Sequence, residues 1–93
     1  MLGLDLARVA AAVGGTLVGD GEAPIRSVVT DSRQARPGDL FVALDGARTD
    51  GHRFLREVQA AGASGALVMP DRGDRPEGFP CVVVPDTLAA LAA

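Results

Sequence analysis

Two short apolar runs, residues 40–44 and 65–69, constrain the fold of this chain most strongly. Runs that are apolar at nearly every position are typical of strands covered on both faces. The segment between them carries apolar residues at helical spacing, namely Phe54, Leu55, Val58 and Ala61. Asp50 can cap this helix, and Gly62 can end it. A strand, a helix and a second strand in this order predict a right-handed βαβ unit in a parallel sheet.

The rest of the chain extends this unit to a complete α/β domain. Three further strands are expected, at 16–18, 25–30 and 81–84. Two further helices are expected, one beginning at Leu6 after the cap residue Asp5 and one at 87–93 after the cap residue Asp86. The 93 residues leave no room for a second core. We therefore predict one small α/β domain, with a mixed, mostly parallel sheet of about five strands and helices packed on it.

The sheet is expected to be mixed because of one short link. Only about nine residues join the predicted strands 25–30 and 40–44. Parallel neighbours normally need a crossover of roughly a dozen residues or more. We therefore expect these two strands to be antiparallel or not adjacent.

Composition excludes several classes of function. Twelve acidic residues against nine basic ones give a net charge of −3, every basic residue is Arg, and Trp and Tyr are absent. Such a chain lacks the basic surface and the stacking platform of a nucleic-acid-binding protein, so no nucleic-acid partner is expected. No apolar stretch approaches the length of a membrane span. We expect no membrane insertion and a cytoplasmic location.

Several kinds of catalytic site are also excluded. Cys81 and His52 are each the only residue of their type, so the chain can form neither an internal disulfide nor a zinc centre of Cys and His ligands. Cys81 opens an apolar run and is expected to be buried. Because the chain has no Lys, it cannot form a P-loop, and it carries neither a Rossmann fingerprint nor a nucleophile elbow. We expect no catalytic residue, metal or cofactor in this chain.

Polar residues and glycines gather at the ends of two predicted strands, in the segments 31–33 and 46–52. Ligands of open α/β sheets usually bind outside the carboxyl ends of the strands. Arg33 and Arg48 can contact phosphate oxygens through their guanidinium groups. The two segments therefore suggest a small ligand that carries phosphate.

The start of the helix after Asp50 is a second possible contact for an anion. Free N–H groups of Gly51 and His52 would suit an anionic ligand. A carboxylate cap at Asp50 would occupy those donors and repel the anion, unless it binds ribose hydroxyls or orients His52. The sequence leaves both interpretations open.

Each of these residues also has a purely structural interpretation. Asp31 and Ser32 can close their strand with an Asx turn. Asp50 can be a simple helix cap, and the arginines can be solvated surface charges. His52 has no neighbouring Ser, Cys or His, so a hydrogen-bonding role is favoured over acid–base catalysis.

The segment 30–46 resembles the opening motif of the Mur ligases of peptidoglycan synthesis. In that family the motif reads Asp-Ser-Arg, a short spacer, Pro-Gly-Asp-Leu-Phe-Val-Ala and then Gly. Here it continues with Asp-Gly-His-Arg-Phe at 50–54, and residues 62–66 are similar to the family's Gly-Ala-x-Ala segment. The resemblance covers nearly the whole chain. It implies that residues 1–93 form the N-terminal, UDP-sugar-binding domain of a Mur ligase.

Within the family, residues 14–17 and 84–91 look most like the branch that joins D-alanyl-D-alanine to UDP-N-acetylmuramoyl-tripeptide. The branch that adds the third amino acid is the alternative, and a non-catalytic interaction module that keeps the fold is another. The family resemblance implies that this domain holds the UDP end of UDP-N-acetylmuramoyl-peptide, while the remaining domains of the same protein bind ATP and Mg²⁺. Because the helix at 87–93 has no end signal, we expect the natural protein to continue into those domains.

The resemblance also assigns roles to single residues. It implies that Ser32 hydrogen-bonds the uracil or the ribose and that the 46–52 loop wraps the nucleotide, with Gly46 allowing close approach of the backbone. The further polar contacts would be Arg33, Asp50 and His52. Asp31 and Arg33 can instead form an internal pair that shapes their loop.

A shared site also limits the direction of the strands. If 25–30 and 40–44 were a plain antiparallel pair, the segments that follow them would lie at opposite ends of the sheet. One common pocket therefore requires a parallel or displaced arrangement.

Overall fold

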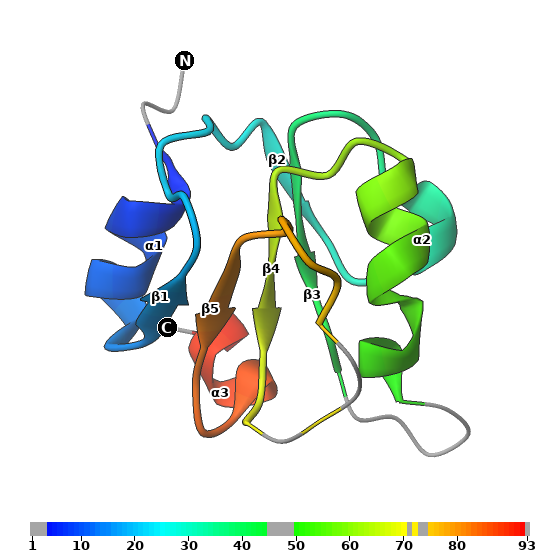
Figure 1. Ribbon diagram of the computed structural model, residues 1–93. Coiled ribbons are helices and arrows are strands. Elements are labelled where there is room, and N and C mark those ends of the chain that lie inside the picture. The colour runs from blue at the N-terminus through cyan, green and yellow to red at the C-terminus, as the bar shows by residue number, and fades with distance from the viewer. Residues whose placement is uncertain (1–3, 45–49, 71, 73–74, 93) are drawn as a thin grey trace.

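Five strands form a single sheet with helices on both of its faces in the computed structural model of this chain (Figure 1). The structure describes residues 4–44, 50–70, 72 and 75–92. In chain order the elements are α1 (Leu6–Val13), β1 (Thr16–Val18), β2 (Ser27–Val29), the 3₁₀ turn η1 (Ser32–Gln34), β3 (Asp39–Val42), the 3₁₀ turn η2 (Gly51–Phe54), α2 (Leu55–Ala60), β4 (Gly65–Val68), β5 (Cys81–Val83) and α3 (Thr87–Ala92).

The sheet has the order β1-β5-β4-β3-β2. Strands β2, β3, β4 and β5 run parallel, and β1 pairs with β5 in the antiparallel direction at one edge. The chain passes from β3 through η2 and α2 into its neighbour β4, which is the βαβ unit that the apolar runs predict. The prediction of a mixed, mostly parallel sheet of about five strands is confirmed.

The expectation drawn from the short link between the second and third strands is wrong, whereas the parallel arrangement that a shared pocket requires is present. β2 lies directly beside β3 and is parallel to it, with Val28 opposite Leu40. The link can be this short because the single turn η1 packs against α2 in the place of a full crossover helix. The chain then reverses at Gly38, whose φ of 87° is the left-handed conformation that glycine adopts most readily. The antiparallel strand that makes the sheet mixed is β1.

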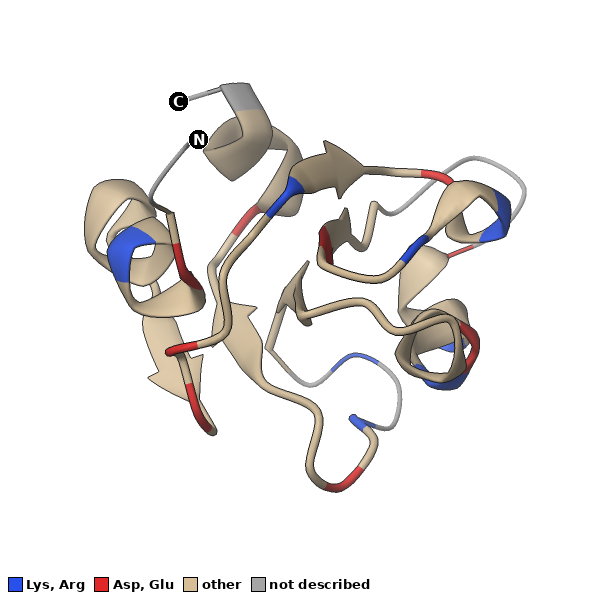
Figure 2. Ribbon diagram, turned by 90° about the horizontal axis from the view of Figure 1, so that it is seen from above, with Lys and Arg blue, Asp and Glu red and all other residues tan. Residues whose placement is uncertain are grey.

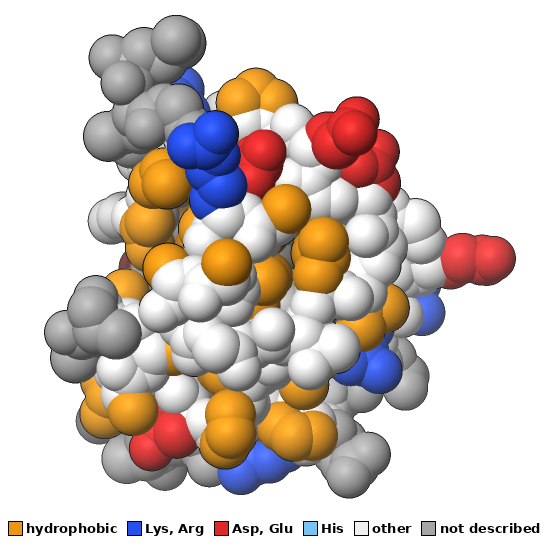
Figure 3. Space-filling model, turned by 90° about the vertical axis from the view of Figure 1, so that its left-hand side faces the viewer, with side chains coloured by type: hydrophobic (Ala, Val, Ile, Leu, Met, Phe, Trp, Pro, Cys, Tyr) orange, Lys and Arg blue, Asp and Glu red, His pale blue; other side chains and the backbone are white. Residues whose placement is uncertain are grey.

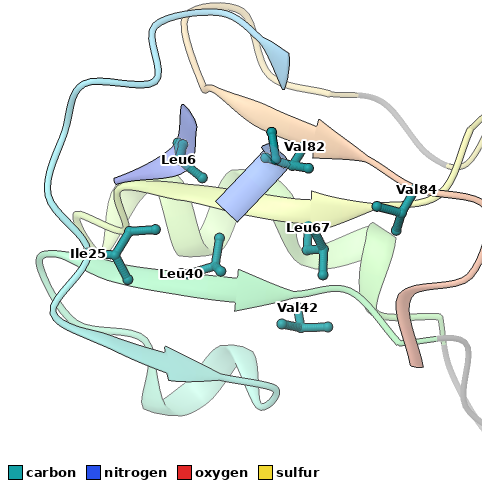
Figure 4. Packing of buried hydrophobic residues seen from close by; sticks show 8 residues of the cluster. Leu6, Ile25, Leu40, Val42, Leu67, Val82 and Val84 are labelled. Carbon is teal, nitrogen blue, oxygen red and sulfur yellow. The ribbon is translucent and has the colours of Figure 1, made fainter. Parts of the chain in front are cut away.

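The inner strands bury side chains on both faces of the sheet. In β3, Leu40 and Val42 face α1, whereas Phe41 faces α2, as expected from the alternation of side chains along a strand. Figure 4 shows the first of these layers, in which side chains of β3, β4 and β5 gather with Leu6 and Ile25. The second layer contains Phe41, Ala43, Leu55, Val58, Ala66, Val68, Phe79 and Cys81. The predicted strands with two covered faces are confirmed.

Cys81 lies fully buried in the second layer, as the sequence predicts. Burial raises the pKa of its thiol to about 11, although the positive charge of Arg75 acts in the opposite direction. The thiol therefore stays protonated at neutral pH and acts as a small hydrophobic side chain.

The predicted helix caps are confirmed. The Asp5 carboxylate accepts a hydrogen bond from the N–H of Arg8 at 2.8 Å, and the Asp86 carboxylate accepts one from the N–H of Leu88 at 3.0 Å. The helix predicted after Asp50 is different in its first turn, because η2 precedes α2. That first turn is held by tertiary contacts of Gly51 with Leu44 and of His52 with Met69.

Charged residues of both signs lie on the helices and in the loops at the ends of the strands (Figure 2). On the face around α1 and β1, separate hydrophobic side chains alternate with polar surface (Figure 3). No helix in the described ranges is both long enough and apolar enough to cross a bilayer.

A candidate ligand pocket at the ends of β2 and β3

A pocket of about 520 Å³ opens beside the carboxyl ends of β2 and β3. It is lined by Thr30, Asp31, Ser32, Arg33, Phe41, Leu44, Gly51, Phe54 and Glu57. The parallel pairing of β2 and β3 places both strand ends on the same edge of the sheet, and η1 and η2 follow these ends directly. The two segments selected from the sequence therefore meet in one pocket, through Asp31, Ser32 and Arg33 on one side and Gly51 on the other.

Asp31 and Arg33 form the internal pair that the sequence left as an alternative. The Asp31 carboxylate accepts from the backbone N–H of Arg33 at 2.9 Å, which closes an Asx turn. The guanidinium donates twice to the same carboxylate, from Nε at 3.1 Å and from Nη2 at 3.0 Å. These hydrogen bonds hold the pKa of Asp31 below its ordinary value and raise the pKa of Arg33. The pair shapes the pocket rim and places little net charge there.

Ser32 offers its hydroxyl to a ligand at this rim, next to Thr30, which also lines the pocket. Ser32 lines the pocket and is partly exposed. Its hydroxyl makes no hydrogen bond within the described part of the chain and can therefore donate to or accept from a bound molecule.

The inner wall of the pocket is apolar and aromatic. Phe41 of β3 is fully buried beneath it, and Phe54 of η2 and Leu44 are half-buried. From the sequence, the two Phe residues are expected to be core residues first, and their contribution to the pocket is missed. No local signal marks this role, because Phe41 and Phe54 meet at the pocket only through the packing of η2 against the end of β3.

Gly51 is held against the end of β3. Its N–H donates to the carbonyl of Leu44 at 2.8 Å. A Cβ atom at this position would lie 2.9 Å from the backbone nitrogen of Leu44 and 3.2 Å from the Cα of Ala43. The close approach of two backbone segments therefore requires glycine here.

The anion site suggested for the amides of Gly51 and His52 is not present. The Gly51 amide is bonded to Leu44, and the His52 amide donates to the Asp50 carboxylate at 3.0 Å. Both donors are occupied by the protein itself.

Asp50 and His52 form a connected polar cluster with the chain that follows β4. The His52 Nδ1 contacts the Asp50 carboxylate, and the backbone N–H of Met69 donates to His52 Nε2 at 2.8 Å. Arg72 Nη1 donates to the second oxygen of Asp50 at 2.9 Å. Partial burial opposes ionisation of Asp50, yet the hydrogen bonds from His52 and Arg72 lower its pKa to about 2.

The cluster lies outside the pocket lining. The His52 side chain is 0% exposed and has protein partners at both ring nitrogens. Of the described site residues on this segment, which are Asp50, Gly51 and His52, only Gly51 lines the pocket. Gly46 and Arg48 lie outside the described residues.

Asp39 is a polar residue that the sequence did not single out. Its carboxylate is buried and accepts from the Ser27 hydroxyl at 2.8 Å and from the Arg36 N–H at 3.0 Å. It closes the turn before β3 and has a structural role. Among the described residues, no three His, Cys, Asp or Glu side chains lie together so that they could hold a metal ion.

Comparison with known proteins shows which family the chain resembles. The sequence profile described as "Mur ligase family, catalytic domain" matches residues 24–92. The UDP-N-acetylmuramoyl-tripeptide--D-alanyl-D-alanine ligase of Mycobacterium leprae is 46% identical over 90 residues, which cover 90% of this chain and 16% of that protein. The UDP-N-acetylmuramoyl-L-alanyl-D-glutamate--2,6-diaminopimelate ligase of Streptomyces coelicolor is 39% identical over 79 residues, which cover 83% of this chain and 16% of that protein.

A solved structure shows the same arrangement of elements. MurF from Acinetobacter baumannii superposes with a TM-score of 0.77 and 33% identity, over 95% of this chain and 19% of that chain. The chain thus spans less than a fifth of the length of these relatives. The match to most of its residues and the shared fold establish that the chain belongs to the Mur ligase family.

Proposed function

We propose that this chain is the N-terminal, substrate-anchoring domain of a Mur ligase and that its pocket holds the UDP end of UDP-N-acetylmuramoyl-tripeptide. The observation that supports this most directly is the meeting of Asp31, Ser32, Arg33 and Gly51 in one pocket at the ends of two parallel strands. Ligand pockets at this edge are the general rule for open α/β sheets.

The charges around the pocket favour the nucleoside half of the ligand over its diphosphate. Among the described lining residues, the charged groups are the carboxylates of Asp31 and Glu57 and the guanidinium of Arg33, and Asp31 already pairs with that guanidinium. The inner wall is apolar and aromatic, which suits a planar base. In this proposal the uracil and ribose enter the pocket, Ser32 hydrogen-bonds one of them, and the diphosphate stays at the opening.

The other steps of the reaction belong to parts of the protein beyond this chain. A MurF structure from Thermotoga maritima was solved in complex with ADP, and this chain covers 16% of it. We propose that ATP and Mg²⁺ bind in the corresponding further domains and that D-alanyl-D-alanine is the group added. A ligase that adds diaminopimelate is the second candidate, because relatives with that name match over a similar share of the chain.

The test is an NMR titration of the ¹⁵N-labelled chain with uridine, UDP and pyrophosphate. Uridine and UDP are expected to shift the amide signals of Ser32, Gly51 and Phe54, whereas pyrophosphate alone leaves them in place. Saturating UDP without shifts at these residues, or equal shifts with pyrophosphate, would contradict the proposal.

A single substitution tests the role of the hydroxyl. Ser32→Ala is expected to weaken UDP binding by about 3- to 10-fold, because it removes one hydrogen bond of ordinary strength. Thr16→Ala, which removes an exposed hydroxyl on β1 at the opposite edge of the sheet, serves as the matched control and is expected to leave the Kd unchanged. If the two variants bind UDP with equal affinity, the Ser32 hydroxyl does not contact the ligand.

A further inference from the structure

The cluster around His52 has one self-consistent arrangement of protons. A backbone N–H can only donate, so the bond from Met69 requires a free lone pair on His52 Nε2. The other ring nitrogen faces the Asp50 carboxylate, which accepts. Both contacts are satisfied when the ring is neutral and carries its proton on Nδ1.

This arrangement joins three segments at the carboxyl edge of the sheet. Asp50 and His52 flank Gly51, whose amide is bonded to Leu44 at the end of β3. Met69 directly follows β4, and its backbone N–H donates a hydrogen bond to the histidine ring. Gly51 and Leu44 both line the pocket, whereas the ring of His52 lies buried behind them.

We propose that His52 is a positioning residue that fixes the Gly51 wall of the pocket through its Nδ1-protonated ring, without touching the ligand. The ring holds Asp50 on one side and the Met69 backbone on the other, and Arg72 fixes the second oxygen of the same carboxylate. Loss of the ring removes one partner of the Asp50 carboxylate and the acceptor of the Met69 amide, so the segment around Gly51 loses two of its contacts. The effect on ligand affinity rests on the proposed function, whereas the effects on the ring and on Gly51 do not.

The first experiment reads the tautomer in the intact chain. Long-range ¹H–¹⁵N correlation spectra at neutral pH are expected to show a protonated Nδ1 and an unprotonated Nε2. A ring protonated at Nε2, alone or together with Nδ1, overturns the proposal.

The second experiment separates positioning from general stability. His52→Ala is compared with Val82→Ala, which truncates a fully buried side chain in the layer on the opposite face of the sheet. Both variants are expected to unfold at lower temperature. Only His52→Ala is expected to speed hydrogen exchange at the Gly51 amide, by about tenfold or more beyond the change in global stability. Equal acceleration in the two variants overturns the proposal.

The third experiment measures affinity and rescue. His52→Ala is expected to weaken UDP binding by about tenfold, whereas Val82→Ala is expected to change it by less than about twofold. His52→Gln can still accept from the Met69 amide, so its affinity for UDP is expected to lie between those of wild type and His52→Ala. Wild-type affinity in His52→Ala overturns the proposal. If His52→Ala does not fold, His52→Gln takes its place in both comparisons. If the wild-type chain binds no UDP, the proposed function fails, and the tautomer and exchange results still decide the role of His52.

Discussion

Gly51 is the residue at which the need for glycine in the sequence and the shape of the pocket have the same cause. Its amide is bonded to Leu44, and its missing side chain lets the start of η2 lie against the end of β3. The residues on either side of it, Asp50 and His52, face away from the pocket into a buried polar cluster. Gly51 therefore connects the pocket wall to the end of β3.

Gly51→Ala is expected to destabilise the chain by about 1–3 kcal/mol, because the new Cβ would meet backbone atoms that cannot rotate away. UDP binding is expected to weaken at the same time. The control is Gly78→Ala, where the positive φ of 76° brings strain but the added Cβ has open space outside this pocket. Urea unfolding and UDP titration of both variants check this prediction, which is contradicted if Gly51→Ala binds UDP like the control.

The roles of the polar residues show how far single positions can be interpreted from sequence. The cap at Asp50 and the Asx turn at Asp31 follow from local hydrogen bonding, and both are present. The contact of His52 with Met69 and that of Asp50 with Arg72 could not be predicted, because they join positions 17 and 22 residues apart in the chain. The residues that bind ligand are still a prediction.

At the level of elements, α3 is attached to the sheet by one buried polar contact. The hydroxyl of Thr87, at the start of the helix, donates to the backbone carbonyl of Ala43 at 2.7 Å. Thr87 is buried, while Leu88 and Leu91 of the same short helix are exposed. The contact ties the start of α3 to the end of β3, while Ala90 of the same helix packs against the core.

Thr87→Val is expected to destabilise the chain by about 1–3 kcal/mol, because it preserves the shape of the side chain but leaves the Ala43 carbonyl buried without its donor. Thr87→Ser keeps the hydroxyl and is the matched control, with a smaller loss. Thermal unfolding followed by circular dichroism measures both. A Val variant as stable as the Ser variant would show that the hydrogen bond contributes nothing net.

For the molecule as a whole, Asp50 makes part of the folding stability depend on pH. Its pKa of about 2 in the folded chain lies below the ordinary value of 3.8. The folded state therefore favours the ionised carboxylate, and the resulting stabilisation is complete above the ordinary pKa and is lost as the pH falls toward 2.

Asp50→Asn is expected to lower the stability at neutral pH and to make the loss between about pH 4 and pH 2 smaller than in wild type. Asp31→Asn is the comparison, because its exposed pair with Arg33 is screened by solvent and salt, and its effect is expected to be smaller. Urea unfolding at a series of pH values gives both curves. Parallel acid slopes for wild type and Asp50→Asn would contradict this prediction.

The sequence by itself determined the elements of this protein and the faces that they bury. Apolar periodicity, Asp caps and helix-ending glycines act within a few residues, so they can be read directly from the chain. Tertiary contacts, in contrast, place β2 parallel to β3, make Phe41 and Phe54 part of a pocket, and bring the Met69 amide to the ring of His52. These contacts join segments far apart in the chain, and they depend on the packing free energy of the whole sheet, to which no local pattern corresponds.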